Sequence, residues 1–253
     1  MNKINRLNEI SKNTFGTPMK IIKYINSQNV YVQFLDKFKY ITKIQYNEFI
    51  NGNVKNPYDK SVCKHGYFGV GKYKSKINHK ITNCYQHWIN MIKRCYNQKC
   101  LLKDNTYKGC SVCDEWLNFQ NFGEWYDKNY YEISNEVMDL DKDILHKGNK
   151  IYAPDNCVFV PHSINSLIIK CDKSRGNLPI GVSFHKRDKI YQASCNNMKK
   201  EIFLGYYDNK IDAFNVYKKY KEELIKKIAD QYKNMIPSNL YCMLYNYSVE
   251  ITD

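Results

Sequence analysis

The sequence predicts a modular α+β protein, and three observations carry that prediction. Near the start of the chain, two stretches rich in β-branched and aromatic residues flank a short polar turn, which is typical of a β-hairpin. In the middle, apolar residues recur at three- and four-residue steps, the period of a helix with one buried face. In the last third, three short strand-like stretches precede a long amphipathic segment. We therefore expect a small N-terminal β module, a central domain, and a C-terminal three-stranded sheet packed on one long helix.

Composition favours a folded protein with a polyanionic partner. The chain has 253 residues, of which 43% are hydrophobic, so it can bury the cores of two or three modest domains and is not a fully disordered chain. Lysine and arginine total 39 against 25 acids, which gives a net charge of +14. Because basic side chains neutralise phosphates and release counterions, nucleic acid is the first partner that this charge predicts.

Cysteine usage and hydropathy bear on the compartment. The ten cysteines lie at scattered spacings, and the chain does not start with an apolar signal peptide. We therefore expect a reduced, cytoplasmic protein rather than a secreted disulfide framework. No apolar run approaches the roughly 18 residues that a transmembrane helix needs, so we expect no membrane partner.

The N-terminal module is predicted from residues 19–24 and 29–35, with Asn26-Ser-Gln as the turn of a hairpin. Turn-forming residues at 51–58 mark its end, and a glycine-spaced, lysine-rich segment follows at 66–76. That segment either follows a phosphate backbone or is a solvated basic linker. We place the module and this segment in residues 1–76.

The central region opens with a predicted helix over residues 83–96, followed by a short strand and a second helix within 107–125. The predicted buried faces of the two helices consist of Trp88, Met91, Ile92 and Cys95, and of Trp116, Phe119, Phe122 and Trp125. Cys84 and His87, with Cys110 and Cys113, have a spacing that permits zinc. They fall among core positions, where buried thiols are ordinary, so we do not expect a structural zinc.

Residues 137–165 form the stretch with the most chemical content. They predict a strand that ends in acidic residues, a Gly/Asn/Pro loop, a second short strand and the start of a helix. This arrangement brings Asp141 and Asn165 to one point. A carboxylate and an amide oxygen suit a hard divalent cation.

The C-terminal region begins at a Gly/Pro-rich junction at residues 175–182. The three predicted strands are 182–184, 190–195 and 201–205, and a helix follows over 210–232 with Asp208 or Asn209 as its N-cap. Residues 241–251 have larger apolar residues at alternate positions, which predicts a closing strand, although the first half is also compatible with a helix.

Two of these stretches resemble known families. Asn156-Cys-Val-Phe-Val-Pro-His-Ser-Ile-Asn165, preceded by Asp141-Lys-Asp143, resembles the distal half of the HNH nucleases, which have the ββα-metal fold. Residues 91–96 and 113–122 also resemble the lead-in of many phage HNH proteins. The resemblance covers about residues 85 to 170, and we place the HNH-like domain at 77–174.

The HNH resemblance implies roles for individual residues. Asp141 matches the metal-binding aspartate, Asn165 the helix residue that completes the metal site, and Asn156 the asparagine that braces the loop. Asp143 lies beside them as part of the site. The implied activity is hydrolysis of a DNA phosphodiester with Mg²⁺ or Mn²⁺ as cofactor.

This chain departs from the HNH pattern at the base, because Lys142 stands where the family has histidine. An unperturbed lysine, with a pKa of ~10.4, is protonated at neutral pH and is a poor base. Three alternatives are open. Lys142 holds the phosphate as a cation while His146 or His162 supplies the base, or the water needs no strong protein base, or the site has lost catalysis and kept DNA binding.

The C-terminal region, residues 175–253, resembles the plant-type apetala/ethylene-response-factor DNA-binding domain. The residues that carry this resemblance are Gly181-Val182, Tyr191-Gln-Ala193, Leu204-Gly-Tyr206, and Asp212-Ala-Phe followed by Tyr217. In that family the sheet lies in the major groove, so double-stranded DNA is the implied partner. The implied DNA contacts in this sequence are Lys186, Arg187, Lys189, Tyr191, Lys199 and Lys200.

Together these features predict a phage-type, homing-like, metal-dependent DNA endonuclease that nicks or cuts duplex DNA, located in the host cell cytoplasm if phage-encoded. The alternative is a non-catalytic DNA-binding regulator or inhibitor with a degenerate HNH core. A third class is an RNA-binding protein, because a charge of +14 does not distinguish the two polymers.

Overall fold

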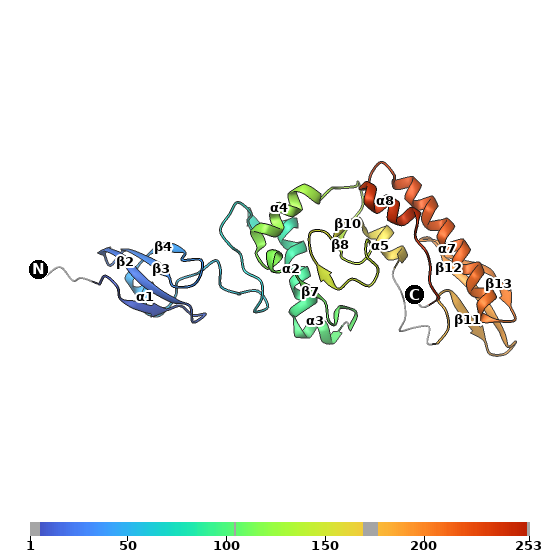
Figure 1. Ribbon diagram of the computed structural model, residues 1–253, viewed down its shortest axis with the longest axis horizontal. Coiled ribbons are helices and arrows are strands. Elements are labelled where there is room, and N and C mark those ends of the chain that lie inside the picture. Colours follow the sequence, from blue (N-terminus) through green and yellow to red (C-terminus); the bar gives the residue numbers. More distant parts are fainter. Residues whose placement is uncertain (1–5, 104, 169–176, 252–253) are drawn as a thin grey trace, which may run out of the picture. The chain divides into compact units, whose positions relative to one another are not determined.

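The computed structural model describes residues 6–103, 105–168 and 177–251. The chain divides into two compact units, Met1–Tyr126 and Asp127–Asp253, which are described separately below. Helices and several small sheets occur in both units (Figure 1), which confirms the predicted α+β class.

The first unit begins with an antiparallel sheet in the order β1-β2-β3-β4. Its strands are β1 (Ile10–Lys12), β2 (Pro18–Asn26), β3 (Asn29–Phe34) and β4 (Ile41–Ile44), and α1 (Tyr46–Asn51) follows them. The predicted hairpin is confirmed, since β2 and β3 pair from Met19↔Phe34 to Asn26↔Asn29. Alternate residues of both strands, with Phe49 of α1, form the core of this module.

The rest of the first unit is a helical region with an aromatic core. Its elements are β5 (Lys76–Ile77), β6 (Lys80–Ile81), α2 (Asn83–Tyr96), α3 (Gln98–Lys103), the short 3₁₀ helices Asn105–Tyr107 and Asp114–Leu117, β7 (Ser111–Val112) and α4 (Phe119–Asn129). The predicted helix over 83–96 is confirmed. Trp88, Trp116, Phe119 and Phe122 are fully buried, and Trp88 Nε1 donates to Trp116 O at 2.7 Å.

The segment at 66–76 makes aromatic contacts that neither of its predicted alternatives included. The Phe68 ring lies 5.8 Å from Tyr85 and 6.0 Å from Trp88, and Tyr67 N donates to Leu117 O at 2.9 Å. Gly69 has φ +66, and a Cβ there would overlap Asn118. The rings of the segment therefore pack on the aromatic core, while Lys72, Lys74 and Lys76 stay exposed, so a phosphate-binding role of these lysines stays a prediction.

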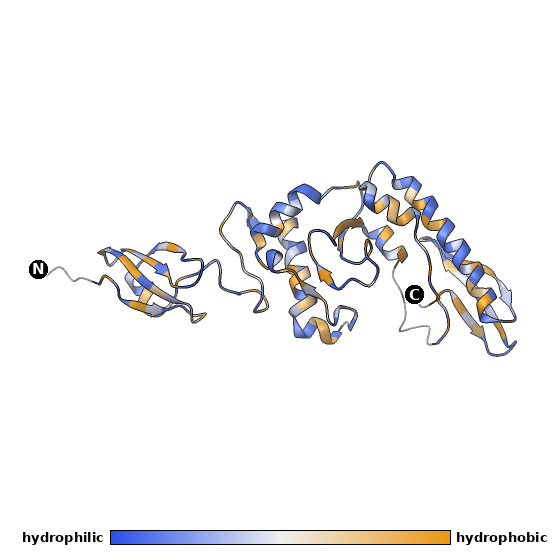
Figure 2. Cartoon of the chain, viewed as in Figure 1, coloured by the Kyte–Doolittle hydropathy of each residue, from blue (hydrophilic) through white to orange (hydrophobic). Residues whose placement is uncertain are grey.

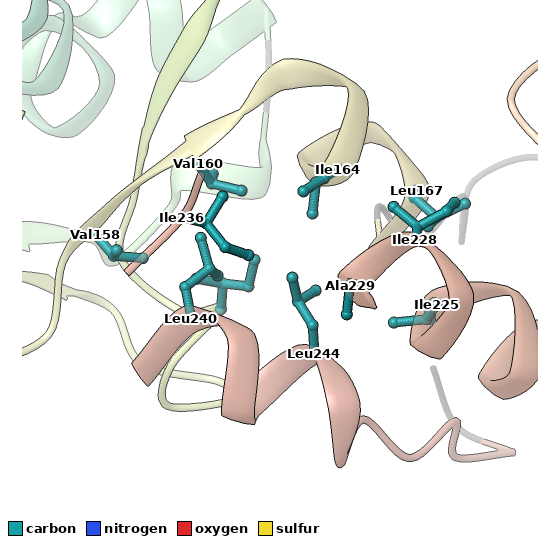
Figure 3. Close-up of a cluster of buried hydrophobic side chains, with 11 residues drawn as sticks. Val158, Val160, Ile164, Leu167, Ile225, Ile228, Ala229, Ile236, Leu240 and Leu244 are labelled. Carbon is teal, nitrogen blue, oxygen red and sulfur yellow. The ribbon is translucent and has the colours of Figure 1, made fainter. Parts of the chain in front are cut away.

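The second unit opens with a strand–loop–strand–helix, as predicted. Strand β8 (Met138–Asp141) pairs antiparallel with β10 (Val158–Pro161), β9 (Ile151–Tyr152) lies in the connecting loop, and α5 (His162–Ile168) follows. We call β8, β10 and α5 the site hairpin. One side of it packs on α7 (Lys210–Tyr232) and α8 (Ser238–Tyr245) through an aliphatic core (Figure 3).

The remaining strands of the second unit form a second antiparallel sheet, β11 (Val182–His185), β12 (Ile190–Asn196) and β13 (Glu201–Tyr207), in sequence order. The three predicted strands and the long helix are confirmed, and Asn209 Oδ1 caps α7 by accepting from Ile211 N and Asp212 N. Helix α7 alternates hydrophobic and hydrophilic residues (Figure 2) and buries Ala213, Phe214 and Tyr217 against the sheet.

One expectation about the second unit is corrected. Residues 241–251 form no strand: α8 occupies the first half as far as Tyr245, which confirms the helix alternative there, and residues 246–251 are irregular. The predicted domain boundaries at residues 76 and 174 stay predictions, and the second lies outside the described residues. The C-terminal half of α7 covers the site hairpin, so these parts of the second unit share one core. No helix in the described ranges is long and apolar enough to cross a membrane.

Candidate functional site

Four polar side chains gather on the site hairpin. Asp139 and Asp141 are two residues apart on β8, so they project from the same side of the strand, while Met138 and Leu140 between and before them are buried. His162 and Asn165 are three residues apart on α5 and therefore share one face of that helix. The hairpin thus brings a strand face with two carboxylates toward a helix face with a ring and an amide.

The side chains of His162 and Asn165 on α5 both contact Asp139 on β8. Its Oδ2 lies 2.8 Å from His162 Nδ1 and 3.0 Å from Asn165 Nδ2. The Asp139 side chain is 22% exposed and the His162 ring 62% exposed. Because Asp139 binds Nδ1, it holds the ring in a fixed orientation, and Nε2 remains the nitrogen that can exchange a proton with solvent.

Asp139 was not predicted as a site residue. Asn165 was expected to join Asp141, whereas its amide contacts Asp139. The signal in the sequence was strand alternation, because a residue two positions before Asp141 has to share its face. Strand alternation does not predict where α5 lies relative to β8. The position of α5 is the reason that the Asn165 amide contacts Asp139 rather than Asp141.

Asp141 has a more enclosed position. Its Oδ1 accepts from Asp143 N at 2.8 Å and from Ile144 N at 2.7 Å, so it closes the turn that follows β8. Burial, and then the nearby Asp143 carboxylate, raise the pKa of Asp141, against the lowering effect of these hydrogen bonds and of Lys142. A cation at this carboxylate would favour its ionised form.

Two asparagines hold the loop of the hairpin. Asn149 Nδ2 donates to Lys142 O at 2.6 Å and to Ile151 O at 2.8 Å. Asn156 Nδ2 lies 3.3 Å from Ile151 O and 3.4 Å from Asn149 Oδ1. Asn156 therefore contacts the loop at the position where a bracing role was predicted, and Asn149, which was not predicted, makes the shorter contacts.

The structure separates the three residues for which a catalytic role was considered, Lys142 as a phosphate-binding cation and His146 or His162 as the base. The Lys142 side chain is 9% exposed, with Nζ 3.1 Å from Asp143 Oδ1 and 5.8 Å from the centre of the Tyr152 ring. The ammonium group is thus engaged inside the loop, which corrects its predicted role of reaching out to a DNA phosphate. His146 is exposed on the loop and its side chain makes no hydrogen bond with described residues. His162 alone is joined to the site.

The donor set suits a hard cation. Carboxylate and amide oxygens from Asp139, Asp141 and Asn165 are the ligand types that Mg²⁺ and Mn²⁺ prefer. Among the described residues, no group of three or more His, Cys, Asp and Glu is arranged to hold a metal ion, which applies also to Cys84, His87, Cys110 and Cys113. An oxygen site would therefore depend on the Asn165 amide and on water.

A second polar cluster connects α5 to α7 through hydrogen bonds. Tyr232 Oη and Ser163 Oγ both donate to Glu136 Oε1 at 2.7 Å, and they lie 3.3 Å from each other. Ser163 is next to His162, so this cluster fixes the first turn of α5. The position of His162 therefore depends on residues almost seventy positions apart in the sequence.

The C-terminal sheet has one covered and one open face. Register places Val182 opposite Ala193 and Phe184 opposite Tyr191, and Ala193 is buried under α7. The predicted DNA contact of Tyr191 is therefore corrected, because the side chain lies on the helix-covered face, 4.9 Å from Phe184. Alternation assigns the open face to residues that were not predicted as DNA contacts: Ser183, His185, Gln192, Ser194, Phe203 and Tyr206.

The predicted basic contacts lie in the two turns that connect these strands. Lys186, Arg187 and Lys189 are exposed in the first turn, and Arg187 forms a two-pronged ion pair with Asp188 at 2.7 and 3.1 Å. Lys199 and Lys200 are exposed in the second turn, where both of their backbone N–H groups donate to Asn197 Oδ1. The turns thus present four lysines and one partly neutralised arginine at the edges of the open face.

Comparison with known proteins gives no match: no family model, no curated protein and no solved structure is similar to this chain. We therefore infer function from the geometry of the site and the sheet.

Proposed function

We propose that the protein is a metal-dependent DNA endonuclease of the HNH type, which hydrolyses phosphodiester bonds with Mg²⁺ or Mn²⁺. The observation that supports this most is the convergence of His162 Nδ1 and Asn165 Nδ2 on Asp139 Oδ2. It gives the site an oriented histidine beside a pair of carboxylates on a hairpin followed by a helix. A general base and a set of oxygen ligands are the two parts that hydrolysis of a phosphodiester needs.

The chain's own residues have distinct roles in this proposal. His162 removes a proton from the attacking water through Nε2, while Asp139 holds its ring and stabilises the imidazolium that forms. Asp141 and Asn165, with Asp139, would hold the cation. When bound, the cation supplies charge stabilisation to the scissile phosphate and the leaving oxygen. Lys142 and Asn149 keep the loop in shape, and they do not take part in the reaction.

Binding of double-stranded DNA is assigned in this proposal to the C-terminal sheet. The open face offers Gln192 and Ser183 for hydrogen bonds, and the turns offer Lys186, Lys189, Lys199 and Lys200 for phosphates. Phosphate contacts would hold the sheet on the duplex, and the side chains of the open face would contact base edges.

A non-catalytic DNA-binding protein is the second candidate. The observation that favours it is the state of Lys142, which stands where the HNH family has histidine, is 9% exposed and is paired with Asp143. In that case the site hairpin would be structural, and the sheet would carry the function alone.

Plasmid cleavage separates the two candidates. Purified protein is incubated with supercoiled plasmid and with long genomic DNA, in Mg²⁺, in Mn²⁺ and in EDTA. We expect metal-dependent nicking or cutting that His162→Ala lowers about 100-fold or more, since a general base contributes on this order. Ser166→Ala is the matched control, because Ser166 is on the same helix, is exposed, and among the described residues donates to Ser163 O alone.

Asp139→Asn is the companion variant. It removes the negative charge that orients His162 and that would also help to hold the cation, so we expect a loss at least as large as that of His162→Ala. Absence of nicking under all metal conditions would leave the DNA-binding candidate. Nicking that survives both substitutions would show that the site lies elsewhere.

A further inference from the structure

The strongest feature that the proposed function leaves unused is an open groove on the N-terminal module. Its volume is about 370 Å³. Three aromatic rings and three lysines contribute to its lining: Phe15, Phe38, Tyr58, Lys37, Lys60 and Lys64. We infer that this groove binds a single strand of DNA, with unpaired bases stacking on the rings and phosphates paired with the lysines.

The rings are presented to solvent. Phe15 is 61% exposed and Phe38 is 37% exposed, which is unusual for phenylalanine. Phe38 stacks face to face on Tyr58, with the ring planes 7° apart and the centroids 3.9 Å apart, so each ring covers one face of the other and the outer face of Phe38 is the one a base can use. Lys37 Nζ lies 5.0 Å from the Phe38 centroid, where an exposed lysine can move aside for a base. Flat exposed rings fit the faces of bases, and those faces are accessible only in an unpaired strand.

A buried polar network holds Phe15 in place. Asn13 is 5% exposed, and its Oδ1 accepts from Phe15 N at 3.1 Å and from Thr17 N at 2.9 Å. Its Nδ2 donates to Asp59 Oδ2 at 2.6 Å, and Thr17 Oγ1 donates to Asp59 Oδ1 at 2.5 Å. The turn that carries Phe15 is thus fixed to the segment that carries Tyr58 and Lys60. Because this turn is already ordered, little conformational entropy is lost there when a ligand binds.

Charge favours a polyanion over a protein segment or another apolar partner. Residues 6–64 contain ten lysines and arginines against four acids. The two acids of the groove are occupied, because Asp59 is in the buried network and Asp36 accepts from Phe38 N and Lys39 N at 3.0 Å and from Asn56 Nδ2 at 2.7 Å. These hydrogen bonds hold the two carboxylates in place, whereas Lys37, Lys60 and Lys64 are exposed and can reach toward a ligand. A basic groove with aromatic rings is the combination found in proteins that bind single strands.

The inference that the ligand is an unpaired strand depends on the groove alone. The inference that this strand is DNA rather than RNA rests on the proposed function. The groove inference and the proposed endonuclease activity can therefore fail separately. Binding is measured in EDTA, so that the result does not depend on whether the site hairpin cleaves.

The test uses the full chain and fluorescence anisotropy with an oligothymidylate of about 20 nucleotides, its duplex with oligoadenylate, and the matching oligouridylate. We expect Phe15→Leu, which keeps an apolar side chain but removes the ring, to weaken binding of the single strand about tenfold and to leave duplex binding unchanged. Phe15→Trp should retain the affinity. Lys37→Gln with Lys60→Gln should weaken binding and flatten its salt dependence.

Matched controls are on the same module and outside the groove. Ile50→Ala truncates an apolar side chain that is 55% exposed, and Lys43→Gln removes the charge of an exposed lysine. Both control variants should bind the single strand as the unmodified protein does. Unchanged binding of the single strand by Phe15→Leu and by the lysine variant would overturn the inference and favour a protein segment as occupant. An equal loss on the duplex would also overturn it. Equal or tighter Phe15-dependent binding of oligouridylate would overturn the choice of DNA.

Discussion

The site hairpin and the C-terminal sheet are built alike and carry opposite charge. Both are antiparallel strands followed by a helix, and both pack on α7, the hairpin against its C-terminal half and the sheet against its N-terminal half. The hairpin places Asp139 and Asp141 on its polar face, whereas the sheet places Lys199 and Lys200 in its turns. The covered faces of the two regions are both apolar. The regions differ in their exposed groups, which are carboxylates on the hairpin and lysines in the turns of the sheet.

Helix α7 is therefore the common scaffold of the two regions. A cluster of aliphatic residues joins the hairpin to α7 and α8, and in it Val160 and Ile164 of the hairpin share one core with Ile228 of α7 and Leu240 of α8 (Figure 3). Any change in this cluster should affect the hairpin and the helix together. In contrast, changes in the turns of the sheet should affect binding without affecting the hairpin.

Leu240→Ala tests the shared core and should have the greatest effect. Leu240 is fully buried in α8, so truncation should lower the free energy of unfolding of the second unit by about 2–5 kcal/mol. Hydrogen exchange followed by mass spectrometry should show faster exchange in β10, α5 and the C-terminal half of α7 together. Leu102→Ala is the control, since Leu102 is 85% exposed. If exchange increased only in α8, the hairpin and α7 would not be one cooperative region.

The next prediction concerns the sheet. Lys199→Gln with Lys200→Gln should weaken duplex binding about tenfold and reduce the slope of log affinity against log salt by about 0.9 for each phosphate that is no longer neutralised. Mg²⁺ binding at the proposed metal site, measured as a rise in melting temperature, should be the same in this variant as in the unmodified protein. Two exposed lysines of α7 outside the turns, Lys219 and Lys227, provide a charge-matched control when both are changed to glutamine. A similar decrease in the control would mean that net charge, not the turns, sets the affinity.

Much of the fold followed from periodicity. The helices at 83–96 and 210–232 and all three C-terminal strands lie where the spacing of apolar residues places them, because local pattern and tertiary packing agree there. The failures have one cause. Tyr191 was assigned to DNA because the sequence does not say which face of the sheet α7 covers, and Phe68 was assigned to a linker because its partners lie on helices further along the chain.

The site shows the same limit. Asp141, Asn156 and Asn165 were predicted from their resemblance to a pattern, and the structure brings them to one hairpin. Asp139 was missed, although it contacts both His162 and Asn165 of the helix, because its role appears only when β8 and α5 are placed against each other. Lys142 was given a chemical role that its burial removes. The residue types along the sequence predicted which segment forms the site. Tertiary packing determined which side chains contact one another within it.

Asp141→Asn tests the carboxylates of the hairpin. Of the predicted changes, it should have the smallest effect on the free energy of unfolding. Burial and the Asp143 carboxylate raise the pKa of Asp141 above its ordinary value of 3.8, so the folded protein binds this proton more tightly than the unfolded chain does. The wild type therefore loses stability as pH rises through the interval between the two pKa values. Asparagine keeps an oxygen that can accept from Asp143 N and Ile144 N, and it has no charge to bury.

The variant should match the wild type below about pH 3 and exceed it at neutral pH, by on the order of 1 kcal/mol or less. Thermal melts across pH, with and without Mg²⁺, measure this. Mg²⁺ should raise the melting temperature of the wild type and not that of the variant, because a ligand that binds only the folded state stabilises it. Asp155→Asn, at an exposed acid of the same loop, should respond to Mg²⁺ as the wild type does. A variant that is still stabilised by Mg²⁺ would remove Asp141 from the metal site, whereas a variant that is less stable at neutral pH would show that its charge supports the fold.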